Sequence, residues 1–511
     1  MQQGCTVRYM AIDNTMVTYP PQGSMGISPS THFLSSIFIG SGFHTGTQWQ
    51  VSRNSDFTDI VHDSGLSLTS LIYYNLKDFG VELDHSTTYY VRLRHENNKG
   101  QTSSWSDPVM FTTRHALLAG AERHRIQLTQ STFSEIPSGK VTLSAGGRVA
   151  AFTSRYSGGD AVDRGMVSVF RRAGDTWRPD VTFTSFRDVQ TDSFGSTVAI
   201  SDDGRVIAVI DQSDEDDDTD PAVVVYRRTD AGWSKAVLLY PNDGHPSHMY
   251  GISIGISYHG DVIAVGDPGC NVSGNGSGCV HVFHHRYGTW LCDAPITRLN
   301  SEPGDHFGAS VELSSDGRVL VVGAPGSTVY NSWNVRSAGT AHIFRHNVGW
   351  VCEATLHATP PVDGAEFGRH VSISGDGTLI AVSALSAIKS APVTLYERCD
   401  GYWVETYPLP VDKNLARQAN SECISLSEDG KSILIGHPMD THVGIPSGYV
   451  MVYTRSQDRW SVAYQLTPSD SHQTMHFGQS LKLSRDGSTA IVSGIADTGT
   501  GIKYHTAYIY I

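Results

Sequence analysis

The chain lacks the long apolar segment and the basic cluster that would indicate a membrane or a nucleic-acid partner. No stretch of its 511 residues reaches the roughly 18 consecutive apolar residues of a membrane helix. Its formal net charge is −14, and its 37 Lys and Arg residues form no cluster. We therefore expect neither membrane insertion nor binding to nucleic acid or to an anionic membrane surface.

Local signatures of enzymes and of export are also missing. The sequence contains no G-x-S-x-G, no H-E-x-x-H and no P-loop. Met1 to Val17 shows no basic segment followed by an apolar run, so a secretory signal peptide is not expected. These absences favour a protein that is not an enzyme, although sites assembled from distant loops leave no local motif.

Cysteines are few and their number is odd. The seven residues Cys5, Cys270, Cys279, Cys292, Cys352, Cys399 and Cys423 have irregular spacing, which predicts no complete disulfide framework and no zinc pattern. Cys270 and Cys279 flank a loop of Gly, Ser and Asn and are the one candidate disulfide, with two thiols as the alternative.

A short motif recurs seven times, of the form apolar-x-apolar-Ser-x-x-Gly followed by a second apolar run. The copies include VAISDDGRVIAV, VELSSDGRVLVV and VSISGDGTLIAV. Their turn glycines lie 53 to 60 residues apart, at Gly147, Gly204, Gly260, Gly317, Gly377, Gly430 and Gly487. Each copy predicts two strands joined by a tight turn, in which glycine supplies the positive φ.

Two further strands complete each repeat, the third ending at an aromatic residue and the fourth beginning near a Trp. Four strands in a repeat of this length, with no helical period, are typical of a propeller blade. We therefore predict an all-β protein with a seven-bladed β-propeller over 115–511. The last copy ends after its third strand, and HRIQLTQ at 124–130 is similar to the fourth strand VAYQLTP at 462–468. The strand near 124–130 is predicted to complete the last blade and so remove an exposed edge.

The strings SFGSTVAIS, HFGASVELSSDGRVLVVGAPG and HFGQSLKLS resemble the FG-GAP repeats of integrin α-subunit propellers. The resemblance covers about residues 120–511 and is best around Phe307 and Gly308, which it implies are structural. The calcium loop of that family, Asp-x-Asp-x-Asp-Gly, is replaced here by a Ser-x-Asp-Gly turn, so calcium binding there is not carried over.

Residues 25–114 contain short predicted strands, among them LDHSTTYYVRLR at Leu83–Arg94. This segment and TQWQVS resemble a fibronectin type III domain, of the kind found in phage virion and tail proteins. The resemblance implies an N-terminal fibronectin type III-like β-sandwich with Trp49 in its core and Tyr89 as the corner tyrosine. Residues 1–24 are expected to form an N-terminal arm.

The loops between second and third strands, and those leading into each Phe-Gly, are expected on one face of the propeller. Because they are longer and differ between blades, this face is the candidate ligand-binding face. Its most distinctive loop carries Tyr330, Asn331, Trp333 and Arg336, a set of flat aromatic rings, an amide and a fork-shaped donor. The alternative is that Trp333 packs against a neighbouring loop.

Metal and cofactor sites are not predicted with a defined pattern. The acidic loop that contains Asp214, Asp216, Asp218 and Asp220 has the oxygen ligands of Ca²⁺ but no EF-hand spacing, and a solvated acidic loop is the favoured interpretation. His281, His284 and His285 have loose metal-like spacing, yet on one strand His281 and His284 point to opposite faces, which argues against a zinc site.

These observations favour a phage virion structural protein, in the tail, in the collar or as a capsid decoration. Its arm and sandwich would bind other virion proteins, and its propeller would attach to a glycan or protein of the host surface, in several copies per particle. The alternatives are a bacterial surface adhesin located on the cell surface, a glycan-cleaving enzyme of a virion, and a purely architectural role.

Overall fold

The computed structural model divides the chain into two compact units, Met1–Leu117 and Leu118–Ile511. Within the residues it describes, no helix is both long enough and apolar enough to cross a membrane. Those residues are 15–20, 22, 24–27, 31–36, 38, 43–68, 72–81, 83–84, 87–113, 122–131, 139–158, 161–174, 176–185, 194–212, 220–234, 236–241, 247–330, 334–388, 391–406, 409–410, 423–438, 448–456, 459–468, 474–485, 487–497 and 503–510.

The first unit contains two sheets, of order β1-β3-β6 and β2-β8-β7-β4-β5. Along β7, residues alternate between the surface and the core, as the two-residue period of a strand requires. The bounds are β1 Val17–Tyr19, β2 Ser24–Ile27, β3 His32–Ser35, β4 His44–Ser52, β5 Ile60–Ser67, β6 Tyr73–Asn75, the 3-10 helix η1 Leu76–Phe79, β7 Thr88–Asn97 and β8 Val109–Thr113.

Aromatic side chains fill the core of the first unit. Trp49 and Tyr89 are fully buried, and the ring of Phe33 stacks on Trp49 with centroids 5.8 Å apart. The Tyr89 hydroxyl accepts a hydrogen bond of 3.0 Å from the backbone N–H of Asp84. This bond ties the segment before β7 to the core.

The expected arm over residues 1–24 needs a correction at its C-terminal end. Val17–Tyr19 forms β1 and pairs with β3, and β2 begins at Ser24 and pairs in parallel with β8. These residues therefore belong to the sheets, because their backbone groups have partners there. Residues 1–14 lie outside the described residues.

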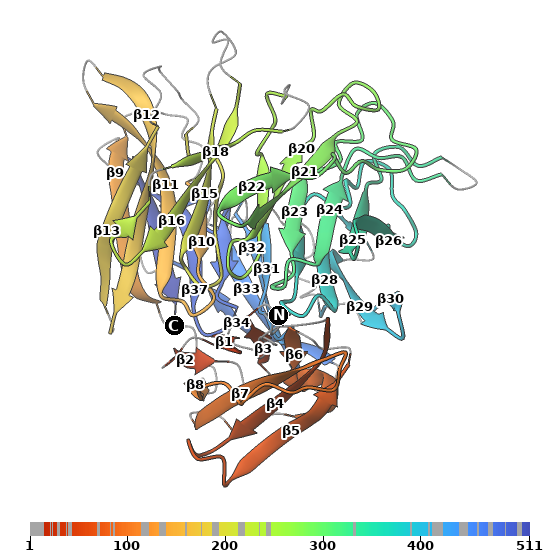
Figure 1. The fold of residues 1–511 in the computed structure, drawn as a ribbon. Coiled ribbons are helices and arrows are strands. Elements are labelled where there is room, and N and C mark those ends of the chain that lie inside the picture. The colour runs from red at the N-terminus through yellow and green to blue at the C-terminus, as the bar shows by residue number, and fades with distance from the viewer. Residues whose placement is uncertain are drawn as a thin grey trace, which may run out of the picture. The chain divides into compact units, whose positions relative to one another are not determined.

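The second unit contains, among its described strands, seven antiparallel sheets in chain order (Figure 1). The first to third sheets are β10 Val141–Leu143, β11 Val149–Gly158, β12 Ala161–Ala173 and β13 Thr176–Thr184; β14 Val198–Ile200, β15 Val206–Asp211, β16 Ala222–Thr229, β17 Gly232–Trp233 and β18 Val237–Leu239; and β19 Ser253–Ile256, β20 Val262–Asp267, β21 Cys279–Arg286 and β22 Thr289–Cys292.

The fourth to seventh sheets follow the same pattern. They are β23 Ser310–Leu313, β24 Val319–Ala324, β25 Thr340–His346 and β26 Trp350–Leu356; β27 Val371–Ile373, β28 Leu379–Ile388, β29 Ala391–Cys399 and β30 Tyr402–Glu405; β31 Cys423–Leu426, β32 Ser432–His437, β33 Tyr449–Ser456 and β34 Arg459–Leu466; and β35 Thr474–Met475, β36 Leu481–Leu483, β37 Ala490–Asp497, β38 Lys503–Tyr510 and β9 Glu122–Ser131.

The turn between the first two strands of each sheet shows why the Ser-x-x-Gly pattern recurs. Ser314 Oγ donates to Asp316 Oδ1 at 2.6 Å and accepts from the Val319 N–H at 2.9 Å. Gly317 has φ +67, and a Cβ there would lie 2.9 Å from a methyl carbon of Val262 in the preceding sheet. Glycine is therefore needed both for the backbone conformation and for the close packing of neighbouring sheets.

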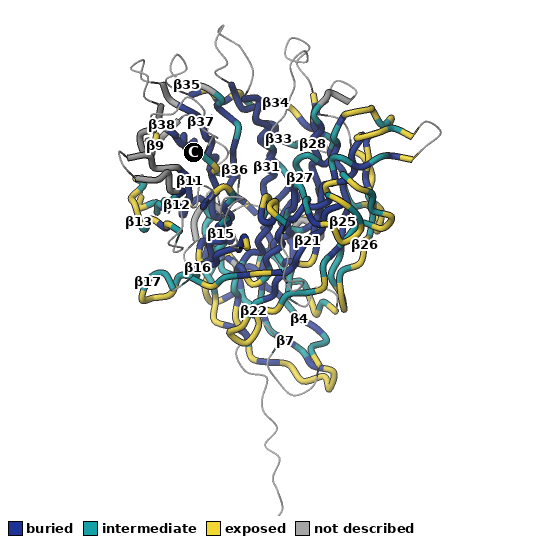
Figure 2. The backbone as a smooth tube through the Cα atoms, turned by 90° about the horizontal axis from the view of Figure 1, so that it is seen from above, coloured by how far each residue is buried: buried dark blue, intermediate teal, exposed yellow. Residues whose placement is uncertain are grey.

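The core lies between successive sheets. In one cluster Val321 and Ile343 of the fourth sheet pack with Val382 and Tyr396 of the fifth. Figure 2 shows this pattern, with buried inner strands and outer strands such as β22 and β26 that are intermediate or exposed. Each sheet thus buries both faces against its neighbours, which is the architecture of a β-propeller.

The seventh sheet is completed by a strand from the beginning of the unit. β9 pairs antiparallel with β38, with Thr506 opposite Gln127 and Ala507 opposite Ile126. The edge of β38 is covered by this pairing, so the two ends of the unit lie in one sheet.

Candidate functional site

Loops from the third, fourth and fifth sheets are hydrogen-bonded to one another and form a loop block, which we define as residues 268–278, 298–309, 325–330, 334–339 and 362–369. The N–H groups of His306 and Phe307 donate to the carbonyls of Gly276 and Ser277, at 3.1 and 3.2 Å. One sheet further on, the N–H of Glu366 donates to the carbonyl of Ser337 at 3.0 Å. Each loop is therefore held by the next, which makes this surface pre-organised.

A buried carboxylate shapes the loop before the fourth sheet. Asp305 is 2% exposed, and its Oδ2 accepts from Arg298 Nη1 at 2.5 Å and from the Glu302 N–H at 2.8 Å. Its own carbonyl accepts from the Gly326 N–H at 3.1 Å. Asp305 therefore joins two loops of the block in one arrangement.

Phe307 and Gly308, which the sequence marks as structural, lie at the base of the block. Phe307 is fully buried, with its ring 5.9 Å from that of Phe344. Gly308 has φ +95, and a Cβ there would lie 2.5 Å from the carbonyl oxygen of Cys279 in the third sheet. Tyr250 and Gly251 occupy the same place one sheet earlier, a match that a search for Phe-Gly misses.

Two of the candidate ligand residues, Tyr330 and Arg336, lie in the block beside the bridge of Val329 to Val335. The Tyr330 ring is exposed, and its hydroxyl donates to Glu302 Oε1 on the neighbouring loop. This hydrogen bond to a carboxylate raises the pKa of Tyr330. Arg336 is also exposed, and its carbonyl accepts from the Gly364 N–H at 3.1 Å. Asn331 and Trp333 lie outside the described residues.

Two exposed apolar side chains of the same block were not predicted. Leu299 is 86% exposed on the loop that carries Glu302, and Val272 is 57% exposed on the loop of the third sheet. Neither belongs to a repeated motif, so only the hydrogen bonds between their loops and that of Tyr330 identify them as one surface.

The acidic loop of the second sheet yields little structural information. Asp214, Asp216 and Asp218 lie outside the described residues, and Asp220 is exposed at the start of the next strand. The solvated acidic loop therefore stays the prediction, with calcium binding as its alternative.

The candidate disulfide is wrong: Cys270 and Cys279 are not joined by a disulfide bond. Their loop is closed instead by a backbone hydrogen bond of 3.0 Å from the Gly278 N–H to the Cys270 carbonyl. The Cys279 thiol points to His281, with Sγ 3.2 Å from Nε2. The backbone bond makes a covalent closure unnecessary for this turn.

The repeated Asp side chains accept hydrogen bonds from other residues of their own turns. Each accepts from the Ser hydroxyl two residues earlier, at Asp203, Asp316, Asp376 and Asp429. This agrees with their interpretation as turn formers, because the same oxygen also accepts from the N–H two residues later, as at Asp316.

Charged side chains of the seventh sheet form a second polar cluster, which the sequence did not indicate. Arg485 Nε binds Asp202 Oδ1 of the second sheet at 3.0 Å, and Lys482 Nζ binds Glu312 Oε1 of the fourth at 2.5 Å. Burial raises the pKa of Asp202, whereas at Glu312 the two cations outweigh burial and lower the pKa. These pairs join sheets that are not neighbours, so we assign them a structural role.

No protein-family model matches the chain, and no curated protein matches it. The solved structures that are similar include the β-propeller domain of Cps50 (Swd1) from Myceliophteria thermophila, with 10% identity, a TM-score of 0.46 and coverage of 75% of this chain and 99% of that one. The propeller of Dos1 has 12% identity and a TM-score of 0.42, with coverage of 94% of this chain and 95% of that one.

The β-propeller domain of the trilobed protease from Pyrococcus furiosus has 10% identity and a TM-score of 0.38, with coverage of 76% of this chain and 93% of that one. Identities this low carry no inference about ligands or partners. The chain's own antiparallel sheets, which bury their core between successive sheets, identify it as an all-β protein with a β-propeller fold.

Proposed function

We propose that the chain is a virion structural protein of a phage, in which a seven-bladed FG-GAP-type propeller attaches to a host surface and performs no catalysis. The observation that carries the proposal is the loop block. It presents Tyr330, Arg336, Leu299 and Val272 on loops that are hydrogen-bonded across three sheets. Exposed aromatic and apolar side chains on a rigid support lose little entropy on binding, as attachment surfaces require.

The seven sheets of the described residues, each matching one copy of the sequence repeat, support the assignment of seven blades. The first unit supports the fibronectin type III-like sandwich. Its two sheets enclose Trp49, and the Tyr89 hydroxyl bonds back to the backbone of Asp84, as a corner tyrosine does. The link to a phage virion rests on the resemblance of this unit to modules of virion and tail proteins.

The location is tested by quantitative mass spectrometry of density-purified particles beside washed cell envelopes from the same source. A stoichiometric amount in particles is the expected result. Presence in envelopes alone would refute the virion assignment and favour a bacterial surface adhesin, without affecting the binding surface.

The surface itself is tested by binding of the labelled full-length chain to host cells. The double variant Tyr330→Ala and Arg336→Ala is expected to reduce binding at least tenfold, since truncated hot-spot residues each cost about 2 kcal/mol or more. Tyr402→Ala removes a tyrosine that is 76% exposed at the start of β30, outside the block, and serves as the matched control.

Equal binding by the wild type and the double variant would show that the block is not the attachment surface and would favour an architectural role. Release of soluble sugar from host polysaccharide during the assay would identify a glycan-cleaving enzyme instead. The two readouts separate binding from turnover on the same sample.

A further inference from the structure

A three-residue polar slot recurs between neighbouring sheets of the propeller. It contains the residue after the aromatic of the third strand, an acid of the fourth strand, and the second residue after the aromatic in the next sheet. Between the first and second sheets these are Arg171, Asp180 and Arg228. Both arginines bind Asp180 Oδ2, at 3.1 and 2.8 Å.

The slot between the fourth and fifth sheets has the same composition. Arg345 Nε binds Glu353 Oε2 at 2.9 Å, and Arg398 binds Glu353 Oε1 at 2.7 Å. In both slots one carboxylate lies between two guanidinium groups. Such a trio links adjacent sheets by charge, and its two guanidinium groups offer no lone pair to a metal ion.

Between the third and fourth sheets, both arginines are replaced by histidine. His284 follows Phe283 on β21, Asp293 follows β22, and His346 lies two residues after Phe344 on β25. His284 Nε2 is 2.8 Å from Asp293 Oδ2, and the two imidazole rings have centroids 5.4 Å apart. One ligand atom from each of the three side chains lies within 4.8 Å of the others.

This exchange changes what the slot is able to bind. A guanidinium has only donors, whereas a neutral imidazole offers a nitrogen lone pair, and two imidazoles with one carboxylate are a common ligand set for first-row transition metals. We propose that His284, Asp293 and His346 form a binding site for a divalent transition-metal ion such as Zn²⁺, which joins the third and fourth sheets.

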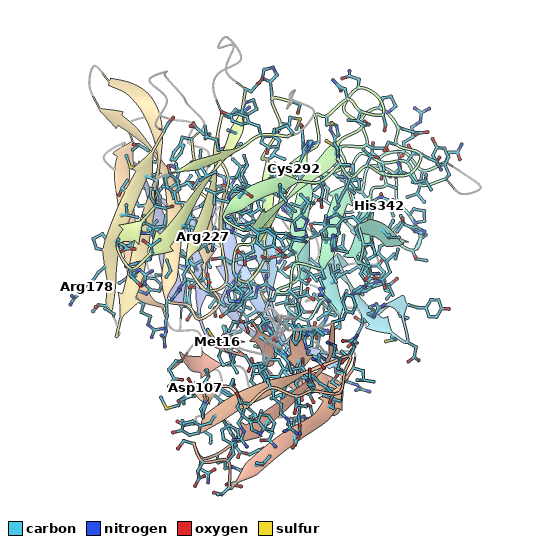
Figure 3. The ribbon with its side chains drawn as sticks, in the orientation of Figure 1. Met16, Asp107, Arg178, Arg227, Cys292 and His342 are labelled. Carbon is cyan, nitrogen blue, oxygen red and sulfur yellow. The ribbon has the colours of Figure 1, made fainter. Side chains whose placement is uncertain are left out.

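The geometry requires only small movements. With metal–ligand bonds of about 2.0–2.2 Å, tetrahedral ligand atoms lie about 3.3 Å apart. The 2.8 Å contact of His284 with Asp293 must therefore open slightly, and His346 must approach. The side chain of Asp293 is 37% exposed, so ions from solvent reach the site, and water fills the remaining coordination position. Cys292, the residue before Asp293, is labelled in Figure 3.

A neighbouring indole orients the carboxylate. Trp350 Nε1 donates to Asp293 Oδ2 at 3.2 Å, as Trp233 Nε1 donates to Asp180 at 3.1 Å in the first slot. Hydrogen bonds of this kind to a ligand residue fix its direction and tune metal affinity. The hydrogen bond from Trp to the carboxylate is thus common to this slot and the first one. The difference between the two slots is that two histidines replace the two arginines.

Asp267, Cys279 and His281 form the other group of suitable side chains among the described residues, and it is buried on the opposite face of β21. The equivalent residues of the fourth sheet are Thr340 and His342, which are hydrogen-bonded at 2.9 Å. The pair of Cys279 and His281 matches this hydrogen-bonded pair, so we do not assign a metal to it.

The test is a Co²⁺ titration of the full-length chain after dialysis against a chelator, followed by visible absorption, with Zn²⁺ used to displace Co²⁺. One ion per chain is expected. The double variant His284→Arg and His346→Arg restores the arrangement of the other slots, so it should fold and lose binding. Trp350→Phe should weaken binding by about 10–100-fold.

His285→Gln, a change of a histidine on the same strand but outside the trio, is the matched control and should bind as the wild type does. Cys279→Thr, which copies the fourth sheet, should also retain binding. No stoichiometric Co²⁺ in the wild type would overturn the proposal. Binding that persists in the double arginine variant, or is lost in Cys279→Thr, would overturn it as well. Circular dichroism of each variant shows whether the fold is kept.

Discussion

The ion pair of Asp202 and Arg485 joins the second and seventh sheets. Its removal tests whether water reaches these two side chains in the folded protein. Both side chains are only 7% exposed, and Asp202 Oδ2 also accepts from Ser315 Oγ at 3.2 Å. Arg485→Met removes the guanidinium and leaves the carboxylate buried. A lost charge-assisted hydrogen bond of about 1.5–3 kcal/mol and a stranded acceptor of about 1–3 kcal/mol give an expected destabilisation of about 3–5 kcal/mol.

The double variant Asp202→Leu and Arg485→Met removes both charges. Because burying two ions is costly, its stability is expected to be close to that of the wild type, which means a large favourable coupling between the two changes. Urea unfolding of the four proteins of this cycle, followed by fluorescence, measures the free energies.

Arg53→Ala in the first unit breaks an exposed pair with Asp84 and is expected to leave the unfolding transition unchanged. It serves as the control for removal of a salt bridge in general. A loss below about 1 kcal/mol for Arg485→Met would refute the argument, because the carboxylate would then be hydrated in the variant.

Three further predictions concern pH, backbone conformation and ring closure. Burial lowers the pKa of His342 to about 3, below the unfolded value of about 6.5. The contribution of neutral His342 to stability is therefore present above pH 6.5 and is lost as the pH falls toward 3. Urea unfolding at pH 6.5 and 4.5 should show a loss of about 2–3 kcal/mol in the free energy of unfolding, and a smaller loss in the variant His342→Gln. Gly308→Ala should cost about 2–4 kcal/mol in thermal unfolding because of its φ and the nearby carbonyl, whereas Gly288→Ala, with φ +79 and open space, measures the cost of φ alone. Ile126→Asp on β9 should destabilise the propeller by about 2–3 kcal/mol in chemical denaturation, because Ile126 packs against the core of the first and seventh sheets. Arg125 is exposed, so a similar loss of stability in Arg125→Gln would contradict this explanation.

Much of the local structure was predictable from short sequence patterns. The turn glycines Gly204, Gly317 and Gly377 lie in tight turns with φ between +67 and +69, as the Asp-Gly pattern predicts. The strand predicted near residues 124–130 pairs with β38. Both features depend on neighbours in sequence or on similarity between repeats, and such signals survive in the amino-acid order.

The candidate site was predictable only in part. The loop that contains Tyr330 was singled out by its composition, but Leu299 and Val272 were missed because they lie in other repeats. The disulfide of Cys270 and Cys279 was wrong, since close spacing along the chain does not show that the backbone has already closed the loop. From the sequence, His284 was considered together with His281 on the same strand. The side chains that His284 meets, Asp293 and His346, lie on the opposite face of that strand from His281.

Residue pattern alone accounts for the strands, the turns and the repeat, because hydrophobic alternation and the conformational freedom of glycine act over a few residues. The metal slot and the pair of Asp202 with Arg485 were decided by packing. Their members lie on different sheets, up to 283 positions apart in the chain, and nothing local distinguishes them. Only the stacking of one sheet on the next brings His346 to Asp293, so this chemistry exists in the folded chain and not in any segment of it.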